Sequence, residues 1–105
     1  MTFDDVRRLV LALPRVVEGT SYRTPAFRVG KKFLLRLKED GVTIAIKMSF
    51  DDRDYLMGAR PQTFFVTDHY RPYPAVLVRL RKIRESQMRD VLQRSWEFVT
   101  KKRLG

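Results

Sequence analysis

The stretch QTFFVTDHYRPYPAVLVRL, residues 62–80, decides the fold that we expect for this chain. It opens with an apolar run, 64–66, and closes with a second, 76–80. Two runs of β-favouring residues joined by a polar loop are typical of paired antiparallel strands. Pro72 and Pro74 fix the backbone φ angle at two places, so we expect a stiff loop. This loop carries His69, the only histidine of the chain, together with Tyr70 and Tyr73.

Residues that precede this stretch predict three more strands. Apolar residues alternate with polar or small ones at 26–29 and 42–48, and Phe33, Leu35 and Leu37 alternate with Leu34, Arg36 and Lys38, as in strands that bury one face. Gly30 with its two following lysines predicts one turn, and Asp40-Gly41 predicts a second. Segment 15–25 contains a glycine, small hydroxyl residues and a proline, and we expect it to be a loop.

Helical spacing of apolar residues predicts three helices. The first begins after Thr2 and ends at Pro14, and a short one begins after Ser49 and ends near Gly58. The third covers about 86–100, with Met88, Val91, Leu92, Ser95, Trp96 and Val99 facing inward. We therefore predict a single α+β domain over residues 1–105: an antiparallel sheet of about five strands, N-terminal and C-terminal helices, and a short middle helix.

The length and cysteine content of the chain bear on its oligomeric state and its cellular location. A chain of 105 residues suffices for one core, and we expect a monomer. The absence of cysteine excludes disulfides and thiolate chemistry and favours a cytoplasmic location. The N-terminus does not resemble a secretory signal, and no apolar run approaches membrane-spanning length.

The charge of the chain is strongly positive and unevenly distributed. There are 22 Lys and Arg residues against 12 Asp and Glu, a formal net charge of +10. Residues 71–105 hold ten of the basic and three of the acidic residues. Such a field attracts polyanions such as nucleic acid. The alternative interpretation is that the charge only keeps the protein soluble.

Sequence motifs for catalysis and metal binding are missing. The chain has no phosphate-binding glycine loop, dinucleotide fingerprint, zinc motif or calcium loop. Asp68 and His69 are adjacent, which does not suit a hydrolytic triad, and no serine lies in a nucleophile elbow. The acidic residues Asp51, Asp52 and Asp54 suit a helix N-terminus better than a cation site. We expect no enzyme activity, no metal and no cofactor.

Two groups of residues are candidates for binding. Arg89 and Arg94 each follow an acidic residue by four positions, so we expect helix-surface ion pairs there. Basic residues without such a partner are the candidate phosphate contacts: Arg28, Lys31, Lys32, Arg79, Arg81, Lys82, Arg84, Lys102 and Arg103. A basic hairpin beside a basic helix end is how winged modules hold the DNA backbone. The candidate pocket residues are Glu18, Tyr22, His69, Tyr70 and Tyr73; the aromatic loop is either a binding site or a rigid structural plug.

Most of the chain also resembles the MmcQ/YjbR family. The resemblance rests on EGTSY at 18–22, TPAF at 24–27, TFFVT at 63–67 with His69-Tyr70 and Tyr73-Pro74, VLVRL at 76–80, and Trp96 with Lys102-Arg103. It implies an α+β domain likened to a double-wing DNA-binding arrangement, with no established enzymatic activity. Arg23 stands where relatives usually have glycine, and Lys101 where many have proline, which would let the last helix run further.

These observations lead to one functional expectation and two alternatives. We expect a small basic protein that contacts the phosphates of duplex DNA with little sequence specificity and without catalysis. One alternative is a small-molecule or peptide-binding module that uses the pocket around His69. The other is a module that binds an acidic protein surface, which shares the salt dependence of DNA binding.

Overall fold

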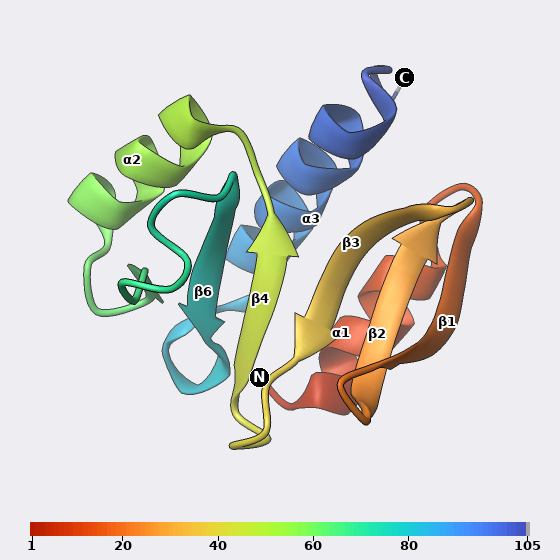
Figure 1. Cartoon of the computed structure of the whole chain (residues 1–105), viewed down its shortest axis with the longest axis horizontal. Helices are drawn as coiled ribbons and strands as arrows, with labels where there is room; N and C mark the ends of the chain where they lie inside the picture. Colours follow the sequence, from red (N-terminus) through yellow and green to blue (C-terminus); the bar gives the residue numbers. More distant parts are fainter. Residues whose placement is uncertain (105) are drawn as a thin grey trace.

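The computed structural model describes residues 1–104 and confirms the pairing predicted for the central stretch. Strand β5 (Phe64–Phe65) runs antiparallel to β6 (Ala75–Arg79), with Phe64 opposite Val78. The other strands are β1 (Val16–Ser21), β2 (Thr24–Val29), β3 (Lys32–Leu37) and β4 (Thr43–Lys47). All pair antiparallel in one sheet of order β1-β2-β3-β4-β6-β5 (Figure 1).

One prediction about the sheet was wrong. Segment 15–25 is not a loop, because residues 16–21 form β1 and pair with β2. The sheet therefore has six strands rather than about five. Strand β1 lies at the edge of the sheet and most of its residues are exposed. Its glycine and hydroxyl residues face solvent, so its sequence lacks the alternation that marks a half-buried strand.

The predicted helices are confirmed, together with their starts. Helix α1 (Phe3–Leu11) is capped by Thr2, whose hydroxyl accepts a hydrogen bond from the Asp5 amide. Helix α2 (Phe50–Ala59) begins after Ser49, whose hydroxyl accepts from the Asp52 amide at 3.1 Å. Helix α3 (Glu85–Thr100) follows a short 3₁₀ turn, η1 (Leu80–Lys82). Such caps satisfy amide groups that a helix leaves unpaired at its start.

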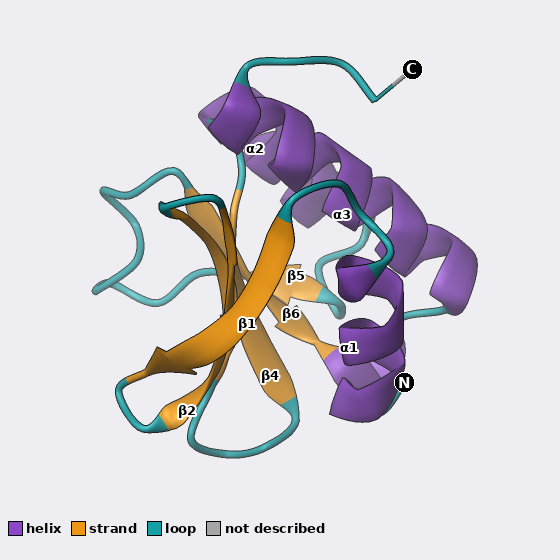
Figure 2. Cartoon of the chain, turned by 90° about the vertical axis from the view of Figure 1, so that its right-hand side faces the viewer, coloured by secondary structure: helices purple, strands orange, loops and turns teal. Residues whose placement is uncertain are grey.

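The core lies between the sheet and two of the helices. Figure 2 shows α1 and α3 on one side of the sheet, while the loop 67–74 lies on the other side. All six residues predicted to face inward from α3 are buried, and the Trp96 indole donates a hydrogen bond to the Pro14 carbonyl at 2.9 Å. We call the helix-covered side of the sheet the core face, and the opposite side the loop face.

The loop face is partly covered as well. Arg36 and Ala45 are opposite each other on β3 and β4 and are both buried, at 7% and 3% exposure. Loop 67–74 is joined to the end of β4 by a hydrogen bond from the Met48 amide to the Pro74 carbonyl, 2.9 Å. The loop face thus carries polar side chains, and loop 67–74 covers part of it.

Candidate functional site

The nine predicted phosphate contacts are divided between two ends of the molecule. Lys47 pairs with Ala75 at one end of β4, whereas Thr43 pairs with Arg79 at the other. Helix α3 has 16 residues and therefore spans about 24 Å between these ends. We call one group the Lys32 end, comprising Arg28, Lys31, Lys32, Lys47, Lys101, Lys102 and Arg103. The other group is the Lys82 end, comprising Arg60, Arg79, Arg81, Lys82 and Arg84.

The Lys32 end brings together three separate segments of the chain. Lys32 at the start of β3, Lys47 at the end of β4 and Lys101 after α3 line one cavity of about 360 Å³. Figure 1 shows the β2–β3 turn, the end of β4 and the end of α3 toward the same end of the sheet. Helix α3 does not run further than Thr100, because Lys101 adopts a left-handed φ of 59° and ends it. The basic hairpin expected beside a basic helix end is therefore present.

None of the seven cations at the Lys32 end has a carboxylate within 4.0 Å among residues 1–104. The ion pairs of the described chain lie elsewhere. Arg89 binds Glu85 at 2.9 Å and Arg94 binds Asp90 at 2.8 Å, as predicted from their spacing. The positive charge of the Lys32 end is consequently available to an external anion.

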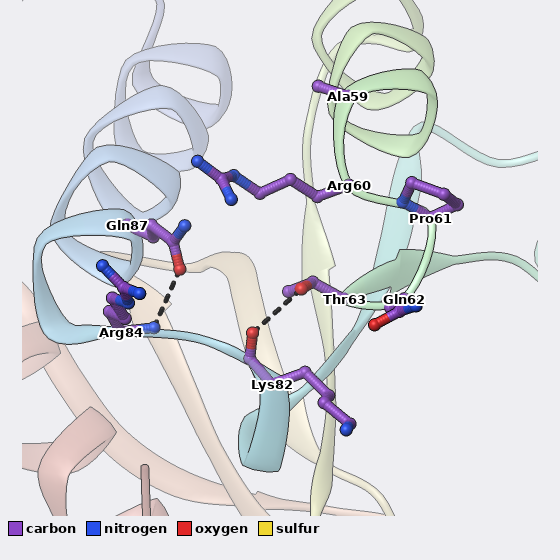
Figure 3. A pocket seen from close by; sticks show the side chains of 8 residues that line it. All are labelled: Ala59, Arg60, Pro61, Gln62, Thr63, Lys82, Arg84 and Gln87. Atoms are coloured by element: carbon purple, nitrogen blue, oxygen red, sulfur yellow. Dashed lines mark hydrogen bonds between the residues drawn. The ribbon is translucent and has the colours of Figure 1, made fainter.

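The Lys82 end is also basic, but its side chains diverge. Arg60, Lys82 and Arg84 line a cavity of about 370 Å³ between the end of α2 and the start of α3. Figure 3 shows Arg60 reaching toward α3 while Lys82 points away from it. Two polar side chains of the lining already bind the backbone: Thr63 donates to the Lys82 carbonyl and Gln87 accepts from the Arg84 amide, both at 2.9 Å.

Four of the five candidate pocket residues surround a single cavity on the loop face. Tyr22, His69, Tyr70 and Tyr73 line a hollow of about 240 Å³, which we call the tyrosine cavity. Its remaining lining residues are Ser21, Phe33, Arg36, Ala45, Lys47 and Ala75. Glu18 does not belong to this group. Its carboxylate binds Arg7 of α1 at 3.1 Å, because Glu18 is opposite Phe27 and shares the core face with it.

A buried arginine holds the loop that carries three of these aromatic rings. Arg53 of α2 is 7% exposed, and its Nη1 donates to the carbonyls of Arg71 and Tyr73 at 3.0 and 2.9 Å. Within the loop, His69 packs edge-on against Tyr70, with ring centroids 5.1 Å apart. The loop is fixed by these contacts as well as by its prolines, so its rings are held in place over the sheet.

A second buried arginine forms part of the cavity wall. Arg36 Nη1 donates to Thr24 Oγ1, the Leu37 carbonyl and Glu39 Oε1, at 3.1–3.3 Å. Burial disfavours its charged form, but the Tyr70 hydroxyl and the Glu39 carboxylate outweigh this effect and raise the pKa of Arg36. The guanidinium lies 4.9 Å from the centre of the Tyr22 ring, a favourable cation–π distance. A fixed guanidinium group, paired with the Glu39 carboxylate at 3.1 Å, therefore lies against the cavity.

Tyr22 reaches the cavity from an unusual turn. Tyr22 and Arg23 join β1 to β2 with φ angles of 53° and 68°. Positive φ at both central residues is the pattern of a type I′ hairpin turn, which prefers asparagine and glycine. A bulky residue in this region costs backbone energy. Tyr22 is nevertheless 78% exposed, so its ring is accessible from solvent.

Sequence reasoning did not propose Arg36 or Lys47 as site residues. The strand alternation of 33–37 and 42–48 already placed both on the polar face of the sheet. A charged residue in the middle of a strand was therefore the available signal for Arg36. What the sequence did not show is that the loop 67–74 folds over this part of the face.

Two further observations concern metal-ligating clusters and membrane-spanning helices. Residues 1–104 contain no group of three or more metal-ligating side chains, and Asp52 is instead paired with Arg94 at 2.6 Å. No helix in the same range is long and apolar enough to cross a membrane.

Three helices with a six-stranded antiparallel sheet, within residues 1–104, define an α+β domain. The chain belongs to the YjbR family, whose model matches residues 11–98. Two uncharacterized proteins, Mb2600 of Mycobacterium bovis and Rv2570 of Mycobacterium tuberculosis, are each 29% identical to it over 121 residues, covering 98% of this chain and 92% of theirs.

The same fold occurs in a solved structure. The crystal structure of Deinococcus radiodurans protein DR2400, which carries the domain DUF419, matches 96% of this chain and 80% of its own. The TM-score is 0.80 at 24% sequence identity, so this likeness concerns the fold. The resemblance to the MmcQ/YjbR family and the α+β class are thereby confirmed. The descriptions of the family and of these relatives indicate no catalytic activity.

Proposed function

We propose that this protein binds nucleic acid without catalysis, and that it contacts the phosphates of duplex DNA through the Lys32 end. One observation carries the proposal: seven cations gather at the Lys32 end, from the β2–β3 hairpin, the end of β4 and the end of α3, against five at the Lys82 end, and none of these twelve has an ion-pair partner among residues 1–104. Lysine and arginine side chains that contact phosphates release counterions from DNA, which favours binding independently of sequence.

The arrangement of these cations supports little base readout. They extend from a turn, a strand end and a helix C-terminus. None lies on a helix face that could enter the major groove, which is where base pairs differ most. Contacts of this kind position a protein on the DNA backbone and do not specify a sequence. We therefore expect affinities of about 10⁻⁴–10⁻⁶ M at physiological salt.

The test compares charge reversal at the two ends. One variant carries Lys31→Glu, Lys32→Glu, Lys102→Glu and Arg103→Glu; the matched variant carries Arg60→Glu, Arg79→Glu, Arg81→Glu and Lys82→Glu. Fluorescence anisotropy of a labelled random duplex at about 50 and 200 mM salt measures the affinity and its salt slope. Heparin serves as a competitor.

The first variant is expected to bind about 100-fold more weakly, and its salt slope should fall by about 0.9 for each phosphate that it no longer neutralises. The matched variant has the same net charge, so it corrects for the long-range field and is expected to lose much less affinity. Equal losses in both variants, or competition by heparin as effective as by duplex DNA, would show that net charge alone accounts for binding.

A further inference from the structure

The tyrosine cavity combines aromatic rings with positive charge and contains no acidic side chain. Its lining holds Phe33, three tyrosines and His69 beside Arg36, which is paired with Glu39, and Lys47, which has no ion-pair partner among residues 1–104. Its volume of about 240 Å³ lies just below the usual range for ligand pockets, about 300–1,000 Å³. The lining therefore suits one small planar ring that is attached to an anionic group.

Two tyrosine rings in this lining are open to solvent. Tyr22 is 78% exposed and Tyr73 is 53% exposed, although large aromatic rings usually gain stability from burial. Tyr22 also occupies a left-handed backbone conformation, with φ of 53°, which costs free energy for a non-glycine residue. Exposed rings held by a strained turn on one side and an anchored loop on the other indicate a surface that stacks on something external.

The tyrosine cavity lies next to the Lys32 end. Phe33 and Lys47 line both the tyrosine cavity and the neighbouring cavity that contains Lys32 and Lys101. A ring in the first cavity would therefore have a row of cations beside it, in the direction of the proposed DNA contact. A nucleotide has this combination, a planar heteroaromatic base joined through a sugar to a phosphate.

We propose that the tyrosine cavity binds the base of one unpaired nucleotide, stacked on the tyrosine rings, with its phosphate beside Lys47 and Lys32. This inference rests on the proposed function where the nucleotide is part of a DNA strand. The same base-and-phosphate chemistry is present in a free nucleotide, and the experiment separates the two sources. Stacking on aromatic side chains is tolerant of base identity, because every base has a π-face.

The experiment uses three labelled duplexes that differ only at one end. The first is blunt, the second has a short overhang of thymidines, and the third has an overhang of the same length made of abasic sugars. The second and third carry the same number of phosphates, so a difference between them measures the contribution of the bases. Adenosine monophosphate, titrated in a calorimeter, tests a free nucleotide.

We expect the thymidine overhang to bind about tenfold more tightly than the abasic overhang, as a stacking contribution of this size predicts. Tyr73→Ala should abolish this difference and leave the affinity for the blunt duplex unchanged. Tyr55→Ala is the matched control, because Tyr55 is 63% exposed on α2 and lies outside the cavity lining. It should preserve the difference.

The possible failures are distinguishable. Equal binding of both overhangs, with no calorimetric binding of adenosine monophosphate, overturns the cavity proposal even if the blunt duplex binds. If no DNA binds but adenosine monophosphate does, and Tyr73→Ala removes that binding, the proposed function is wrong and the cavity is a free-nucleotide site. A preserved overhang difference in Tyr73→Ala also overturns the proposal, since the bases would then be read elsewhere.

Discussion

The two faces of the sheet are built from different kinds of residue. The core face carries Phe27, Leu35 and Ile46, each fully buried against the helices. The loop face carries the buried Arg36, the exposed Tyr22 and a covering loop held by Arg53. Burial of apolar surface stabilises the first face, whereas polar contacts and a strained turn shape the second. We infer that the core face supplies most of the stability, and that the loop face is where the fold presents groups for binding.

The largest effect on stability is expected from removing an aromatic ring that helix α3 contributes to the core. Trp96 is 6% exposed and its indole binds the Pro14 carbonyl. Trp96→Ala should lower the free energy of unfolding by about 3–5 kcal/mol, because it leaves a cavity in the core. Urea denaturation measures this change. The exposed control, Tyr55→Ala, should cost less than about 0.5 kcal/mol. Similar losses in the two variants would show that burial of the Trp96 ring in the core does not determine the cost of its removal.

An intermediate effect on the free energy of unfolding is expected from removing the anchor of loop 67–74 on the loop face. Arg53→Met removes the hydrogen bonds from a buried guanidinium to the Arg71 and Tyr73 carbonyls. We expect a loss of about 2–3 kcal/mol, again measured by urea denaturation, together with loss of the preference for thymidine overhangs. Arg71→Met, in the same loop but exposed, is the control and should be nearly neutral. Unchanged stability in Arg53→Met would show that the loop does not depend on this anchor.

The smallest effect on the free energy of unfolding is expected at the β1–β2 turn, where a substitution should stabilise the protein. Arg23 has a φ of 68°, which glycine adopts without steric cost. Arg23→Gly should therefore raise the free energy of unfolding by about 0.5–1 kcal/mol, measured as an increase in the urea midpoint. Arg28→Gly, inside strand β2, is the control and should be destabilising by a similar amount. A destabilised Arg23→Gly would mean that the arginine side chain contributes more than its backbone costs.

The predictions that succeeded depended on short-range signals. Thr2 and Ser49 start their helices because a side-chain oxygen satisfies amides three residues further on. The inward stripe of α3 follows from helical periodicity alone. Strand β1 was missed because an exposed edge strand lacks the alternation of a half-buried one. Strand β1 is stabilised by pairing with β2, and the residues of β1 show no sequence pattern that predicts this pairing.

The candidate site was only partly predictable for a related reason. The sequence by itself determined a strongly basic chain, the helices and every strand but β1 of an α+β fold, and a stiff aromatic loop around His69. Only the tertiary structure decided that nine candidate cations occupy two ends of the molecule, that Glu18 lies on the core face, and that Arg36 and Lys47 meet the tyrosines. Helix caps and helical periodicity depend on residues that are close in sequence. The positions of these side chains depend instead on the strand order and on the face of the sheet that each side chain occupies. Contacts between distant parts of the chain set both.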